Sequence, residues 1–275
     1  MRYALKSAFF RFFRTKLYLW VLVISVVTGV LIALDTTNVY SLLHFRPRVI
    51  TNEFLCFSIL KIPVVLSVAS AVFCTKFTGS DISYRTINNK ISTGTRRIHI
   101  YIADYIVSET AVILSVLINL MVIFVFAKYA PIKSLIKVDG RVIGVIIQAT
   151  VISIAFTAVY MVLQYFISTK MLAIIISLLI MPAMYMSTYS FKSVLNEPYR
   201  TAYTDEQTGE ASWVLNRKYV GGTARKVVDY SYRSCLFYAF EEEDVDDRSA
   251  AVTSGAVFVL ATAAGVAAIN KKEYP

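Results

Sequence analysis

The chain has few charged residues, and this shortage limits what it can be. Only 17% of its 275 residues are charged, and its mean hydropathy is +0.60. A soluble domain carries about 25% charged residues. A globular core cannot absorb this excess of apolar surface, whereas a lipid bilayer can. The composition therefore indicates an integral membrane protein and not a soluble enzyme.

Histidine, cysteine and phosphate-binding motifs are also scarce or missing. The three cysteines form no CxxC pair, so neither a disulfide framework nor a metal site is indicated. His44 and His99 lie in or near predicted loops on opposite sides, so they supply no metal-ligand set or catalytic base inside a span. No G-x-x-x-x-G-K-[ST] phosphate loop occurs. We therefore expect no enzymatic activity and no cofactor or metal on this chain.

Long apolar runs are abundant, and they predict the fold class. Crossing a hydrocarbon core of about 30 Å takes about 20 apolar residues as a helix. The runs lack the alternation of a barrel strand. We predict an all-α integral membrane protein, with residues 1–275 as a single domain containing about six spans. The predicted spans are 17–34, 54–74, 101–127, 142–168, 171–189 and 251–269.

Lysine and arginine are distributed unevenly between the loops, which predicts orientation. They gather in the N-terminal stretch, in the loop between spans two and three, and in the C-terminal tail. Cytoplasmic loops carry such an excess. We therefore expect a multi-pass protein of the cell membrane with both termini in the cytoplasm. The net charge of +10 then reflects membrane anchoring and contact with lipid, and we expect no nucleic-acid partner.

Two polar segments flank or interrupt the spans. In the first, Leu5, Phe9, Phe12 and Phe13 share one face of a helix, with Arg11 among the residues opposite. This pattern predicts an amphipathic helix at the membrane surface, and a simple basic flank is the alternative. The second, 190–250, is predicted to be an outer segment. Its acidic run 241–247 is predicted to be a solvated surface, with cation binding or substrate attraction as the alternative.

Three charged residues fall inside the predicted spans, where charge is expensive and often functional. Asp104 is close to the start of span three, so an interfacial position is expected. Lys61 and Glu109 differ in predicted depth by roughly 8 Å, a gap that a flexible lysine can partly bridge. Two interpretations remain open: a Lys61–Glu109 pair, or two independent residues that reach water or a neighbouring helix.

The stretch 77–101, between spans two and three, is the most informative part of the sequence. It reads FTGSDISYRTINNKISTGTRRIHIY, which mixes charged residues with apolar ones and contains no proline. A short helix with exposed charge, held between two spans, is suited to docking a soluble partner. A basic loop that only retains the protein's orientation is the alternative.

Here the chain resembles the permease subunits of ABC transporters of the type-2 exporter family. The match is an aromatic, a glycine, an acidic residue and a threonine, then an Asn-Lys pair, then Gly-x-x-Arg and Ile-Tyr. The sequence departs from the family at Arg85, where a glycine is frequent, and at Asn88, where an arginine is frequent. The resemblance implies a cytoplasmic coupling helix that contacts the ATPase through Phe77, Gly79, Asp81, Thr86, Asn89, Lys90, Gly94 and Arg97.

The resemblance also extends to the six-span layout and the large outer segment. It implies that ATP binds a separate ABC ATPase subunit, and that a second permease subunit, identical or different, completes the translocation path. The expected function is membrane permease of an ATP-driven exporter. The aromatic-rich outer segment and the apolar spans favour an amphipathic peptide or lipid-like cargo, with an ion or small drug as the alternative cargo. A non-transporting membrane scaffold or signalling partner is the alternative function.

Overall fold

A computed structural model describes most of the chain. The described residues are 1–37, 52–83, 86–129, 138–167, 169–204, 211–235, 238 and 248–271. The chain divides into two compact units. The first contains residues 1–181 and 251–275, and the second contains residues 182–250. The two units are described separately below.

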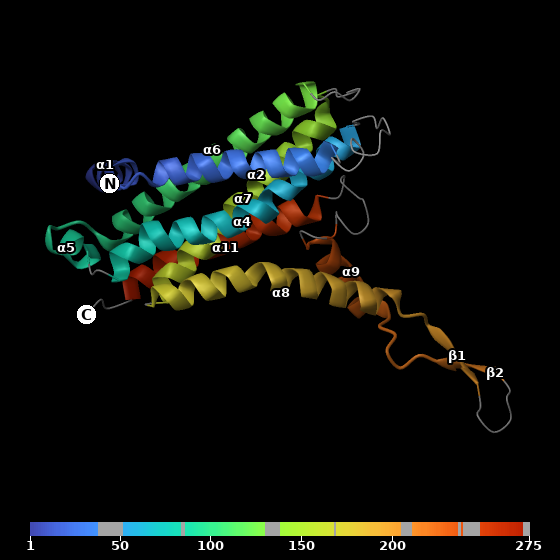
Figure 1. The fold of residues 1–275 in the computed structure, drawn as a ribbon. Coiled ribbons are helices and arrows are strands. Elements are labelled where there is room, and N and C mark those ends of the chain that lie inside the picture. Colours follow the sequence, from blue (N-terminus) through green and yellow to red (C-terminus); the bar gives the residue numbers. More distant parts are fainter. Residues whose placement is uncertain are drawn as a thin grey trace. The chain divides into compact units, whose positions relative to one another are not determined.

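The first unit is a bundle of long helices (Figure 1). Four of them pack extensively on one another, and α1 packs on α6 and α2 at one end. The short α5 connects α4 to α6. The helices are α1 (Arg2–Arg14), α2 (Leu17–Thr37), α4 (Asn52–Ser83), α5 (Thr86–Ser92), α6 (Arg97–Tyr129), α7 (Gly140–Phe166), the first part of α8 (Lys170–Asn196) and α11 (Ser249–Lys271).

Six of the described helices, namely α2, α4, α6, α7, α8 and α11, are long and apolar enough to cross a membrane. This confirms the predicted number of spans and a multi-pass membrane protein. The largest difference in bounds is at α4, which continues beyond residue 74 to Ser83. The prediction of a loop from residue 77 is therefore wrong for its first seven residues. They extend α4 because Phe77, Thr78 and Ile82 are all buried against the bundle.

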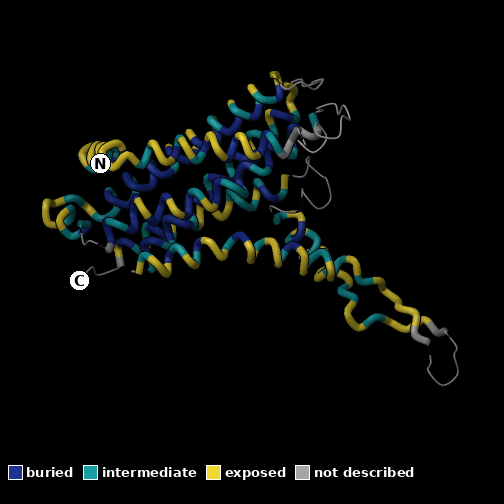
Figure 2. The backbone as a smooth tube through the Cα atoms, in the orientation of Figure 1, coloured by how far each residue is buried: buried dark blue, intermediate teal, exposed yellow. Residues whose placement is uncertain are grey.

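Burial separates the enclosed helices from the exposed ones (Figure 2). Most of α4 and α7 is buried, whereas α11 is buried over only a small part of its length. Its exposed residues are nevertheless apolar, since Val252, Val259 and Leu260 are each more than 60% exposed. Apolar side chains on the outside of a spanning helix suit contact with lipid or with another membrane subunit.

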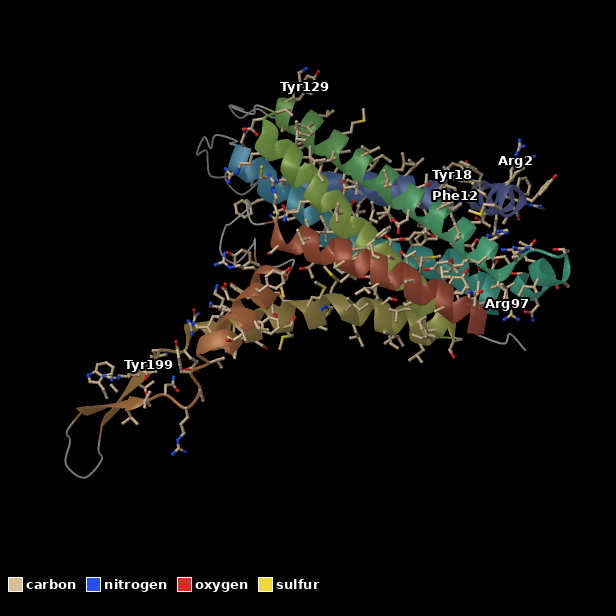
Figure 3. All side chains as sticks on the ribbon, turned by 180° about the vertical axis from the view of Figure 1, so that it is seen from behind. Arg2, Phe12, Tyr18, Arg97, Tyr129 and Tyr199 are labelled. Carbon is tan, nitrogen blue, oxygen red and sulfur yellow. The ribbon has the colours of Figure 1, made fainter. Side chains whose placement is uncertain are left out.

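The bundle has two distinct ends. Helix α1, helix α5 and the C-terminal end of α11 lie at the same end (Figure 1). Arg97 and Tyr129, at the two limits of α6, lie at opposite ends of the bundle (Figure 3). The N-terminal helix and the C-terminal end of the last helix therefore lie at the same end of the bundle, as an even number of spans requires. The assignment of that side to the cytoplasm stays a prediction.

The second unit contains the remainder of α8, a β-hairpin and α9 (Gly222–Arg233). Strand β1 (Arg200–Thr204) pairs antiparallel with β2 (Ala211–Leu215). The Arg225 guanidinium donates to the carbonyl of Leu195 at 2.7 Å, which joins α9 to the end of α8. The all-α prediction is wrong for this hairpin. The predicted acidic run 241–247 lies outside the described residues.

Candidate functional site

Helix α1 meets the bundle through a face that includes a charged residue. Ala8 and Phe12 are buried on this face, while Phe13 is 56% exposed. The predicted helix is therefore present, but the prediction of which residues lie on each face was wrong for Arg11. Arg11 belongs to the buried side and not to the opposite one, because two carboxylates from other helices bind it there.

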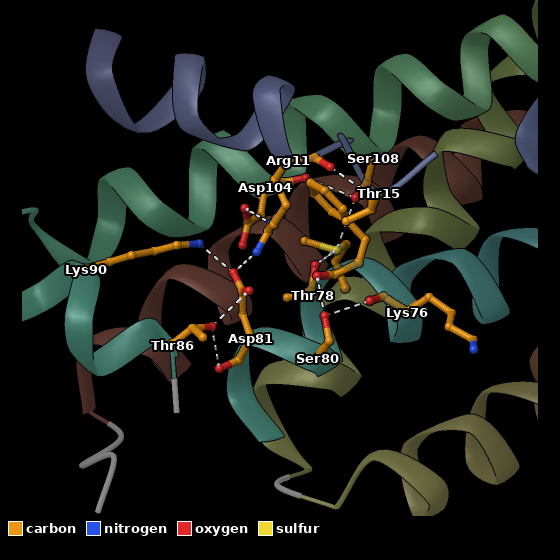
Figure 4. A network of polar contacts seen from close by, with 12 residues as sticks. Arg11, Thr15, Lys76, Thr78, Ser80, Asp81, Thr86, Lys90, Asp104 and Ser108 are labelled. Carbon is orange, nitrogen blue, oxygen red and sulfur yellow. Dashed lines mark hydrogen bonds and ion pairs between the residues drawn. The ribbon is translucent and has the colours of Figure 1, made fainter. Parts of the chain in front are cut away.

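Those carboxylates and a lysine form a compact group with Arg11. We call Arg11, Asp81, Lys90 and Asp104 the charge cluster (Figure 4). Arg11 Nη2 lies 2.8 Å from Asp104 Oδ1, and Arg11 Nη1 pairs with Asp81 Oδ2. The same Asp81 oxygen lies 2.5 Å from Lys90 Nζ. The charge cluster thus links α1, the end of α4, α5 and the beginning of α6.

Uncharged neighbours complete the bonding of the charge cluster. The Thr86 hydroxyl donates to Asp81 Oδ1 at 3.0 Å, and the Tyr165 hydroxyl donates to Asp104 Oδ2 at 3.3 Å. The Arg11 guanidinium also lies over the Phe77 ring, 4.1 Å from its centroid. A cation over an aromatic face gains electrostatic attraction. Asp81 is thus bound by three side chains and Asp104 by two.

The charge cluster is neutral as a whole, with two positive and two negative side chains. Its carboxylates are almost enclosed, since the side chains of Asp104 and Asp81 are 2% and 9% exposed. Burial lowers the pKa of Lys90 below its ordinary value. Desolvating ions is expensive, and the pairing compensates only while every partner is present. The charge cluster therefore fixes the mutual positions of four elements.

The predicted coupling residues divide into two sets. Phe77, Gly79 and Asp81 are buried, whereas Thr86 and Lys90 are partly exposed and bind Asp81. At Gly79 an added Cβ would lie 2.8 Å from the Gln164 amide oxygen, so the glycine allows α7 to approach α4 closely. These five residues hold the connection in place.

The second set faces solvent at the tip of the connection. Asn89 and Gly94 are exposed, and Gly94 adopts a φ of 86°, which favours glycine. Ser92, Thr93 and Arg96 are exposed beside them, whereas Arg97 is only partly exposed. We call these exposed residues of 89–96 the polar tip. The predicted single element 77–101 is thus three parts: the end of α4, then α5 with the polar tip, then the start of α6. Arg85 lies outside the described residues.

The intramembrane charged residues also behave differently from one another. Asp104 is 1% exposed and is paired with Arg11 inside the protein, and the expected interfacial depth stays a prediction. Both Glu109 oxygens are buried and have no hydrogen-bond partner among the described residues. The Lys61–Glu109 pair is therefore not formed in this structure, which favours the alternative of two independent residues.

Sequence reasoning missed two residues of this site, Arg11 and Tyr165. Arg11 sits between phenylalanines in a helix predicted to lie at the membrane surface. Its charged side chain was therefore predicted to face water. The available signal was the need of Asp104 for a positive partner, since a carboxylate inside a span is seldom left unpaired. Tyr165 carries no comparable signal, because nothing in the sequence aligns α7 with α6.

Comparisons with protein-family models, with curated proteins and with solved structures find no match to this chain. The function therefore has to be argued from the six spans, the charge cluster and the polar tip.

Proposed function

We propose that the chain is the permease subunit of an ATP-driven ABC exporter. The observation that carries the proposal is α5 with its polar tip, a short projection between two spanning helices. Its inner side is held by the charge cluster, and its outer side presents the exposed hydrogen-bonding groups of the polar tip. Such a rigid polar projection at one end of a membrane bundle suits docking of a soluble protein.

The charge cluster supplies a route by which movement of α5 reaches the membrane. Lys90 and Thr86 of α5 both bind Asp81 of α4. Asp81 binds Arg11 of α1, and Arg11 binds Asp104 of α6. A displacement of the polar tip therefore acts on three other helices together. This is the property that a coupling element between an ATPase and a translocation path requires.

The partners follow from the same proposal. The sequence contains no phosphate loop, so ATP binds a separate ATPase subunit on the cytoplasmic side. A second permease subunit, identical or different, lines the path with this one, and the exposed apolar side of α11 offers one surface for it. The cargo is an amphipathic peptide or lipid-like molecule, in keeping with the aromatic-rich segment that follows α8.

The test is association with an ATPase through the polar tip. The tagged full chain is purified in mild detergent from membranes of the organism that encodes it, and co-purifying proteins are identified by mass spectrometry. We expect an ATPase with a phosphate loop and ATP turnover that the chain alone does not show. Arg96→Ala is expected to lower its recovery at least about tenfold, as loss of a charge contact at an interface does.

The matched control is Lys128→Ala, which removes one exposed cation at the opposite end of α6. It should leave ATPase recovery unchanged. Asp81→Ala is unsuitable as a test of docking, because Asp81 is buried and its loss disturbs the fold. Recovery of no ATPase with the unmodified chain contradicts the proposal and favours a non-transporting scaffold. An equal loss with both variants contradicts the placement of the docking surface.

A further inference from the structure

A cavity separate from the charge cluster lies within the first unit. Its volume is about 510 Å³, and it is bordered by the first half of α2, the second half of α4 and part of α6. Small-molecule sites typically have volumes of about 300–1,000 Å³. Its lining includes Trp20, Ala69, Lys76 and Ser115, so one end is charged and the remainder is mainly apolar.

The hydroxyl groups that line the cavity are already satisfied. Ser25, Ser70 and Ser115 each donate to a backbone carbonyl three or four residues earlier in their own helix, at 2.6, 2.9 and 2.9 Å. A serine that bonds back to its helix no longer needs an acceptor elsewhere. The interior therefore has little need for water or a polar ligand, and it suits an apolar occupant.

The polar end of the cavity is formed by Lys76. This residue is exposed, and its side chain points away from Asp81 (Figure 4). The nearby carboxylates of Asp81 and Asp104 are already bound by Arg11 and Lys90. Among the described residues no acidic partner is found for Lys76. An anionic group on the occupant would provide one.

The dimensions and position of the cavity match one leaflet of a bilayer. Its lining runs from Leu66 to Lys76 along α4, which is about 15 Å at 1.5 Å per residue. Half of a hydrocarbon core of about 30 Å has the same depth. Trp20, in the first turn of α2, is 66% exposed, as expected of a tryptophan at the membrane interface. The charged end is thus at headgroup level.

We infer that this cavity binds an anionic phospholipid, with one acyl chain between α2 and α4 and the headgroup phosphate on the Lys76 ammonium. A zwitterionic lipid carries its own cation beside the phosphate, so it gains less from Lys76. The site takes its ligand sideways from the bilayer, and it needs neither an ATPase nor a second subunit. The inference is independent of the proposed function.

The test uses Trp20 as a reporter inside the site. The chain contains two tryptophans, so Trp213→Phe leaves Trp20 as the sole tryptophan emitter. The full chain is reconstituted in phosphatidylcholine nanodiscs that contain a small fraction of acyl-brominated phosphatidylglycerol or brominated phosphatidylcholine. Bromine quenches tryptophan on contact. We expect apparent binding about fivefold stronger for the brominated phosphatidylglycerol, the gain that one lysine near an anionic lipid gives.

Two substitutions probe the two parts of the site. Lys76→Gln should remove the headgroup preference, and Ala69→Phe should fill the cavity and reduce quenching while Lys76 is intact. Lys6→Gln, which removes an exposed cation of α1, is the control for general attraction to the surface. Equal quenching by the two lipids overturns the inference. So does a preference that Lys6→Gln lowers as much as Lys76→Gln does. Because Lys76 is exposed, its variant should retain the fold, which gel filtration checks.

Discussion

At the residue scale, Arg11 is the central connection of the structure. It joins Asp81 and Asp104, which lie on two different helices long enough to span a membrane, while α1 has only 13 residues. The contact with Asp104 connects residues 93 positions apart. A pair that is so distant in sequence and so well enclosed constrains the tertiary structure far more than any local contact of α1.

Removing one member of the charge cluster should destabilise the protein strongly. Asp104→Ala leaves the Arg11 guanidinium partly desolvated with one partner fewer, and loss of a buried ion-pair partner costs about 3–5 kcal/mol. The expected result is a clear fall in thermal stability of the chain in mild detergent, followed by gel filtration or tryptophan fluorescence.

The control for this prediction is a carboxylate of a surface pair. Asp229 lies 3.1 Å from Arg233 in α9, and both side chains are about half exposed. Exposed pairs contribute little, so Asp229→Ala should barely change the melting temperature. The double change Arg11→Leu with Asp104→Leu should be less harmful than the sum of the single changes, because it removes both charges of the pair. Equal stability of the Asp104→Ala and Asp229→Ala variants would contradict the role of the charge cluster.

At the scale of elements, helix α11 approaches α6 through a glycine. A Cβ added at Gly265 would collide with the ring and hydroxyl of Tyr101, which is fully buried. Helix α11 contains two pairs of small residues spaced four apart, Ala251 with Gly255 and Ala261 with Gly265, a pattern that favours close helix packing. Gly265 allows close packing within the chain, whereas a Cβ at Gly255 would meet nothing within 4 Å.

This difference yields a matched pair of variants. Gly265→Ala should displace Tyr101 and lower the free energy of unfolding by about 1–3 kcal/mol, the usual cost of overpacking. Gly255→Ala, ten residues earlier on the same helix, should leave stability unchanged or slightly higher. Thermal denaturation of both variants in the same detergent decides the question. If Gly255→Ala is the more damaging variant, the packing of α11 on α6 is wrong.

The elements also show what sequence patterns can and cannot predict. The spans were predictable, because a run of about 20 apolar residues seldom occurs outside a membrane helix. The end of α4 was not, since its last turns contain Thr78, Ser80 and Asp81, which look like a loop until their buried partners are known. The hairpin of β1 and β2 was missed for a similar reason: strands of five residues with mixed polarity give a weak signal.

At the scale of the whole molecule, the arrangement of helices predicts which segments share a side of the membrane. Helices α1 and α5 lie at one end of the bundle (Figure 1). After α8 has crossed, the hairpin should follow on the opposite side. The positive charge near the first end predicts that this end is cytoplasmic. The sequence predicted this topology from charge and span number alone, without any knowledge of side-chain contacts.

Cysteine labelling tests that topology. Single cysteines are introduced at Asn89 and at Trp213, both exposed, in a background without Cys56, Cys74 and Cys235. An impermeant thiol reagent added to intact cells should label position 213 and spare position 89 until the membrane is permeabilised. The reverse pattern shows that the molecule is inverted, and labelling of both positions from outside rules out six spans.

The sequence separation within the charge cluster has a consequence for biosynthesis. Arg11 leaves the ribosome long before Asp81 and Asp104 exist, so we expect α1 to remain at the membrane surface until the third span has been inserted. The ion pairs therefore form late, and their formation indicates that the N-terminal half has been inserted correctly. A nascent chain that lacks α1, or in which α6 is misplaced, leaves Asp104 without its cationic partner. Such a chain offers proteases and chaperones a recognisable sign of incomplete assembly.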